Sequence, residues 1–122
     1  MGRMLVAVAL VIVAGCQMPG SAQGCGTVQI DWVDFIQLGS TQYVAGLATP
    51  ATLQESDLGP VVAQVKFKVA GNVCDPSYRP KDGDAAFLDP GTPIYKVNGN
   101  AVSAMVAARR NGQIAAYVAK SP

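Results

Sequence analysis

The chain of 122 residues contains no histidine, and only 14% of its residues are charged. Histidine is the commonest general base near neutral pH and the commonest protein ligand of transition metals. Its absence removes serine–histidine catalysis and most zinc sites, and no Ser-x-x-Lys sequence offers a lysine base instead. Hydrolysis by two carboxylates, using Asp34, Glu55 or loop aspartates, stays open in principle, but nothing in the sequence pairs them. We therefore expect a protein that is not an enzyme and carries no cofactor or metal.

An excess of charge of either sign is also missing, since the formal net charge is +1. Without the N-terminal Arg3, eight basic residues balance eight acidic ones. Nucleic-acid binding needs a basic surface that neutralises phosphates, so this composition argues against a nucleic-acid partner.

A hydrophobic run long enough to cross a bilayer is missing as well. Residues 4–15 (MLVAVALVIVAG) follow Arg3 and form an apolar stretch of about twelve residues, whereas a membrane-spanning helix needs about twenty. That length is typical of the apolar part of a secretory signal peptide. We expect residues 1–15 to be a signal peptide and residues 16–26 to be the N-terminus and linker of the mature protein.

The run ends in Val13-Ala14-Gly15-Cys16, which resembles the lipobox of bacterial lipoproteins. The resemblance implies cleavage before Cys16 and attachment of a diacylglyceryl group to its thiol, often with a further acyl chain such as palmitate on the new N-terminus. Two or more acyl chains anchor a protein stably to a membrane. The alternative is an ordinary signal peptide cut near residues 21–23, with Cys16 lost. The expected location is outside the cytoplasm, on a bacterial membrane of unspecified layer.

Two cysteines then remain, Cys25 and Cys74. Secretion into an oxidising compartment favours a disulfide between them, and no CxxC pair supports a zinc site instead. The alternative is two unpaired thiols.

Residues 27–120 are expected to form one domain of the all-β class. Alternating apolar residues predict strands over 28–38 and 61–69, and shorter strands over 85–88, 93–97, 102–108 and 113–119. With a strand through Tyr43, Val44 and Leu47, this gives about seven short strands, typical of a small antiparallel barrel or sandwich. One face of the 61–69 strand, from Val61 to Val69, should point inward.

Turn signals separate these strands. Gly39-Ser40 predicts a type II′ hairpin turn, residues 89–92 a type II turn, and Asn111-Gly112 a type I′ turn. The spacing of Thr52 and Glu55 is that of a capping box and predicts one or two helical turns before Gly59-Pro60.

Three segments resemble a group of small bacterial secreted proteins and lipoproteins: DLGP at 57–60, VKFKVAGNV at 65–73 and DGDAAFLDPGTPIY at 82–95. A C-terminal AARRNG at 107–112 adds weaker support. The resemblance implies a compact extracytoplasmic domain and brings no activity with it.

Several residues are candidates for binding. A loop rich in turn-forming residues could bind a partner or a calcium ion, although structural turns, in which each aspartate accepts from nearby backbone N–H groups, are the favoured explanation. Asp34 falls on the apolar face of its strand, where an ionised carboxylate needs a partner or a functional reason. Arg109-Arg110, expected at a hairpin tip, could meet anionic lipid headgroups or a cell-wall polyanion, although charged tips are usually only solubilising. Trp32 and the tyrosines could line a carbohydrate or peptide groove, but the favoured interpretation places Trp32 in the core and divides the tyrosines between core and rim. The loop candidates are Asp75, Tyr78, Asp82, Asp84 and Asp89.

Together these features predict a lipid-anchored binding module that meets a protein or polymer of the cell envelope through a sheet edge or the 74–92 loop. The alternatives are an accessory subunit of an envelope assembly and, with least support, a minor hydrolase.

Overall fold

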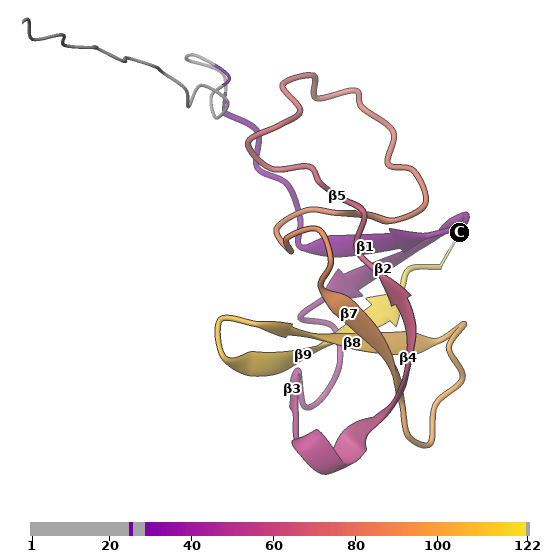
Figure 1. Cartoon of the computed structure of the whole chain (residues 1–122). Coiled ribbons are helices and arrows are strands. Elements are labelled where there is room, and N and C mark those ends of the chain that lie inside the picture. Colours follow the sequence, from indigo (N-terminus) through magenta and orange to yellow (C-terminus); the bar gives the residue numbers. More distant parts are fainter. Residues whose placement is uncertain (1–24, 26–28, 122) are drawn as a thin grey trace, which may run out of the picture.

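A computed structural model describes Cys25 and residues 29–121. The expected signal peptide and Cys16 lie outside these residues. Within the described part, one nine-stranded sheet runs in the order β4-β7-β8-β9-β2-β1-β6-β5, with β3 paired to β9. The all-β prediction is confirmed, and the sheet is strongly curled (Figure 1). No helix of the described residues is long and apolar enough to cross a membrane.

The strands are short, as the density of turn signals predicts. Their bounds are β1 Phe35–Leu38, β2 Thr41–Ala45, β3 Thr52–Leu53, β4 Leu58–Gln64, β5 Phe67–Lys68, β6 Asp84–Ala85, β7 Pro93–Val97, β8 Met105–Arg110 and β9 Gln113–Ala119.

The three predicted turns are confirmed. Gly39 has φ +59° between the paired residues Leu38 and Thr41, as the first central residue of a type II′ turn requires. Asn111 and Gly112 both have positive φ, the signature of type I′. In the 89–92 turn, Thr92 N–H donates to Asp89 O at 3.1 Å and Gly91 has φ +92°.

The prediction of one continuous strand over residues 61–69 is wrong, because two strands with different partners occupy this segment. β4 pairs antiparallel with β7, and β5 pairs parallel with β6. The change of partner falls at Val65, whose N–H donates to Thr92 O, and Lys66, whose N–H donates to Gly83 O. One continuous segment, residues 58–68, therefore supplies both ends of the sheet order, and this brings the curled sheet round on itself.

The inward face predicted for that segment is only partly correct. Val65 and Val69 are buried, but Val61 is 50% exposed and Phe67 is 37% exposed. Register irregularities on both sides of Val61 break the alternation, and Phe67 lies beyond the change of partner.

Other bounds also differ from expectation. The first strand is confined to β1, and residues 29–34 are not part of it. β6 covers only the start of the predicted 85–88 strand. β8 begins at Met105 rather than 102 because Ala104 and Met105 N–H both donate to Ala101 O, forming a turn. The predicted helical turn is the 3₁₀ turn η2 (Glu55–Asp57), and its capping box uses Gln54 and Asp57, two residues after the pair predicted.

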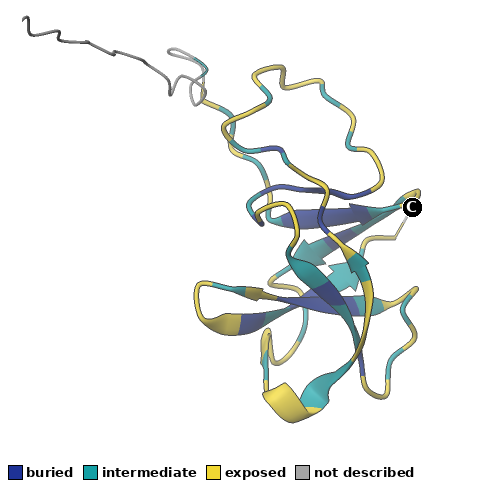
Figure 2. Ribbon diagram, in the orientation of Figure 1, coloured by how far each residue is buried: buried dark blue, intermediate teal, exposed yellow. Residues whose placement is uncertain are grey.

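The core has a main cluster inside the curl and two satellites (Figure 2). The main cluster includes Ile36, Tyr43, Ile94, Val106 and Tyr117. A second cluster of Phe35, Val69 and Ala86 lies on the other side of β1, where Trp32, Val73, Tyr78 and Phe87 pack against it. β1 is therefore buried on both faces, unlike the one-sided strand that alternation predicts.

Candidate functional site

The acidic loop does not form one site. Asp75 accepts hydrogen bonds from Ser77 N–H (2.9 Å) and Ser77 Oγ (2.8 Å), a local turn that lowers the pKa of its carboxyl. Asp89 pairs with Lys68 at 3.4 Å. Among the described residues, no three acidic or cysteine side chains are grouped to hold a metal ion.

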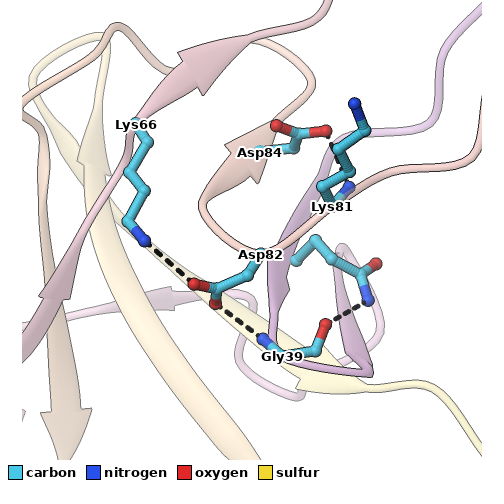
Figure 3. A network of polar contacts seen from close by, with 6 residues as sticks. Gly39, Lys66, Lys81, Asp82 and Asp84 are labelled. Atoms are coloured by element: carbon cyan, nitrogen blue, oxygen red, sulfur yellow. Dashed lines mark hydrogen bonds and ion pairs between the residues drawn. The ribbon is translucent and has the colours of Figure 1, made fainter.

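Asp82 ties the loop to the first hairpin (Figure 3). Its carboxylate accepts from Gly39 N–H at 2.7 Å and from Lys66 Nζ at 3.0 Å. These two donors, the Gly39 N–H foremost, lower the pKa of Asp82. Gln37 Nε2 donates to Gly39 O at 2.9 Å, so the hairpin turn is bound on two sides.

Asp84 is buried, with 4% of its surface exposed, and its Oδ2 accepts two hydrogen bonds. It accepts from Tyr78 Oη at 2.6 Å and from Lys81 N–H at 2.8 Å. The hydrogen bond to Asp84 is the main reason that the pKa of Tyr78 rises to about 12. Lys81 Nζ lies 5.9 Å from the centre of the Tyr78 ring.

Tyr78, Asp82 and Asp84 thus come together round an open hollow, whose other walls are Lys66, Phe67 and Lys81. Each carboxylate there already accepts two hydrogen bonds from the protein. This arrangement can hold the loop in place, and it leaves the acidic groups poorly placed to bind a cation.

Asp34, the carboxylate expected on an apolar face, is held by two side chains from the C-terminal hairpin. Tyr117 Oη donates to it at 2.9 Å and Arg110 Nη1 at 2.8 Å. The side chain of Asp34 is 17% exposed. Burial, with the nearby Asp34 charge as a second cause, raises the pKa of Tyr117. The network joins the residue that precedes β1 to β8 and β9, and a structural role accounts for it.

The two arginines expected at the hairpin tip are paired residues of β8. Besides its bond to Asp34, Arg110 lies over the Phe87 ring, 4.9 Å from its centre. Arg109 makes a two-pronged ion pair with Glu55, which lowers the pKa of that carboxyl. The idea of a free cationic tip is therefore not supported.

The sulfur atoms of Cys25 and Cys74 lie at disulfide distance, with Cα atoms 5.3 Å apart. Beside them is a hollow of about 160 Å³ whose walls are backbone and apolar side chains. Its lining residues are Cys25, Ile30, Trp32, Ala70, Gly71, Val73 and Phe87. Of the tyrosines, Tyr43 and Tyr117 are buried in the core, and Tyr78 and Tyr95 are partly exposed.

β4 is a terminal strand of the sheet, with β7 as its partner on one side. Val61 and Val62 are 50% and 41% exposed, and Leu58–Gln64 contains no charged residue. Edge strands are usually protected by charge, proline or irregular pairing. Here Pro60 and the register irregularities on both sides of Val61 give partial protection, and Val61 and Val62 remain as exposed apolar side chains on an uncharged edge.

Sequence reasoning missed the partners of these carboxylates. Arg110 and Tyr117 are 76 and 83 positions from Asp34, so no local spacing could reveal them. The alternation predicts an inward position for Val61, which is exposed, because the pattern does not reveal the register irregularities on both sides of it. A weak signal was present in Pro60, which favours edge strands.

Comparisons of the chain with protein-family models, curated proteins and solved structures found no significant match.

Proposed function

We propose that this chain is a lipoprotein, anchored to a bacterial membrane through acylated Cys16, whose extracytoplasmic β domain binds another component of the cell envelope. The lipobox-like leader supports the anchor. The Cys25–Cys74 pair at disulfide distance supports an oxidising compartment, because stable disulfides are rare in the cytosol.

The observation that carries the binding role is the apolar edge of β4. The outer side of an edge strand presents backbone N–H and C=O groups to an incoming strand, and its side chains select the partner. Val61 and Val62 are the exposed apolar side chains on this edge. A partner with an extended, uncharged segment fits this edge, since no charge of β4 would be buried on pairing.

The 74–92 loop is the weaker binding surface. Asp82 and Asp84 are engaged with Gly39, Lys66, Tyr78 and Lys81, and a ligand would have to displace those contacts. The proposal assigns no catalytic step to any residue.

The anchor is tested by mass spectrometry of protein extracted from membranes. We expect an N-terminal peptide that starts at Cys16 and carries acyl groups. A mature chain that starts beyond Cys16 would contradict the anchor.

The binding edge is tested by placing a photoreactive residue at position 62 and irradiating intact cells. We expect a cross-linked species that disappears when Val61 is changed to Lys. Leu47 is a matched control, because it is apolar and 61% exposed but lies outside the strands. Equal cross-linking from positions 47 and 62 would rule out β4 as the binding edge. A stable stoichiometric product would favour an accessory subunit of an assembly over a transient binder.

A further inference from the structure

The end of the domain that carries Cys25 has its own apolar surface. The hollow beside the disulfide is lined by Ile30, Trp32, Val73 and Phe87 among others, and each of these four side chains is partly exposed. Next to Trp32, Val33 is 56% exposed. Val73 belongs to the loop of residues 71–82, which lies at the end of the molecule opposite η2 (Figure 1).

This surface is built on the core. Trp32, Val73 and Phe87 pack against the buried cluster of Phe35, Val69 and Ala86. The Cys25–Cys74 link fastens the point where the chain enters the domain to the loop that borders the hollow. The position of the entering chain relative to Trp32 is therefore fixed by covalent structure.

The length of the preceding chain limits where this end can lie. Nine residue steps separate Cys16 from Cys25, and a fully extended chain of that length spans at most about 30 Å. If Cys16 carries the lipid, Cys25 and the hollow stay within that distance of the bilayer surface.

The chemistry of the surface fits a lipid interface. Tryptophan is enriched at the headgroup level of membranes, where its ring is partly apolar and its N–H can reach water. Basic charge contributes little, because Arg79 and Lys81 on the adjoining loop face three exposed carboxylates, Asp31, Asp75 and Asp82, and no excess of positive charge is left to attract anionic lipids. The contact should therefore be apolar and insensitive to salt.

We propose that the disulfide end of the domain docks on the interface of the membrane that holds its lipid anchor, with Trp32 at headgroup depth. This inference rests on the acylation of Cys16 proposed above. It orients the molecule, because η2 and the start of β4 lie at the opposite end (Figure 1).

The test uses the full protein extracted from membranes and reconstituted in phosphatidylethanolamine–phosphatidylglycerol vesicles. Trp32 is the only tryptophan in the chain, so its fluorescence reports this surface alone. We expect the emission maximum of Trp32 in the vesicle-bound protein to lie at shorter wavelength than in the same protein in buffer without vesicles or detergent. We also expect quenching by lipids brominated near the headgroup end of their acyl chains, with no change at high salt. Bromine quenches only near contact, so tethering without docking would leave the emission unquenched.

A pair of variants locates the contact. Ile30→Glu should abolish most of the quenching, whereas Val61→Glu, at the sheet edge, should leave it unchanged. Circular dichroism of both variants checks that they fold.

Mass spectrometry of the same sample separates this inference from the anchor. Acylated Cys16 with unquenched Trp32 would overturn the docking and leave the lipoprotein proposal intact. Unacylated protein that is still quenched would support the docking and contradict the anchor. Unacylated and unquenched protein would contradict both.

Discussion

At the scale of single residues, the polar side chains of this domain link distant parts of the chain through hydrogen bonds and ion pairs. Asp34 receives hydrogen bonds from Tyr117 and Arg110, and Asp82 binds the Gly39 turn. A carboxylate with several donors must lose them together if one element moves, so each such cluster resists local displacement.

Changing Asp34 to Asn should lower the free energy of unfolding by about 1–3 kcal/mol, because Arg110 loses its charged partner in a half-buried position. Urea unfolding measures the effect. Asp31→Asn is the control, since Asp31 is exposed and should tolerate the change. Equal stability of the two variants would show that the Asp34 network contributes nothing to folding.

Alkaline pH should weaken the Tyr78–Asp84 contact. The pKa of Tyr78 is raised from its ordinary value of 10.0 to about 12, so the folded state retains a proton that the unfolded chain releases. The stabilisation is complete below pH 10 and is lost as the pH approaches about 12. We expect the unfolding free energy of the wild type to fall more over this range than that of Tyr78→Phe. Parallel curves would contradict the assignment.

The sequence reveals at this scale which residues need explanation but not what explains them. The alternation through Ile36 and Leu38 marks Asp34 as a charge on an apolar face, and it is indeed largely buried. Its partners lie on the last hairpin, and only the fold brings them near.

At the scale of elements, local chemistry determines the hairpins, and tertiary pairing determines everything between them. Gly39, Asn111 and Gly112 adopt positive φ, which few other residues tolerate, so the two hairpin turns can be predicted from the sequence. β7 and β9 match the predicted bounds. Residues 58–68 do not match, because their apolar alternation is compatible with one straight strand and contains no signal for a change of partner.

Gly83 shows why the DGD sequence at 82–84 has a glycine at its centre. Its φ is +92°, and a Cβ there would lie 2.5 Å from Lys66 Cδ. Gly91 has the same φ with no atom within 4 Å of its Cβ position. Gly91→Ala should therefore cost about 1–2 kcal/mol from the backbone alone, and Gly83→Ala should cost more.

Chemical denaturation of both alanine variants measures the difference. Adding Lys66→Ala to Gly83→Ala should recover part of the extra loss by clearing the space. If the two glycine variants are equally stable, the Lys66 contact does not constrain this position.

At the scale of the whole molecule, the all-β class follows from the density of short alternating segments and turn signals. The number and order of strands do not follow, because three two-residue strands leave too little pattern to detect. The parallel pairing of β5 with β6 depends on the loop between them, which the sequence marks only as irregular.

The disulfide is the main covalent contribution to the stability of the whole domain. Cys25 and Cys74 are 49 positions apart, and closing such a loop stabilises a fold by roughly 4 kcal/mol through the entropy of the unfolded chain. We expect the Cys25→Ser/Cys74→Ser variant to unfold at correspondingly lower urea concentration. The wild type should shift toward it when a reductant is added, and the variant should not respond. A wild type insensitive to reductant would contradict a stabilising bond.

The double role of residues 58–68 also has a consequence for the order of folding. The β1–β2 and β8–β9 hairpins join residues that are close in sequence and can form early. By contrast, β4 must pair with β7 and β5 with β6 before the curled sheet is complete. Loop closure over such separations makes these the slow contacts. Mutations in residues 58–68 should therefore act mainly on the unfolding rate if this segment docks last, while mutations in the two hairpins slow folding.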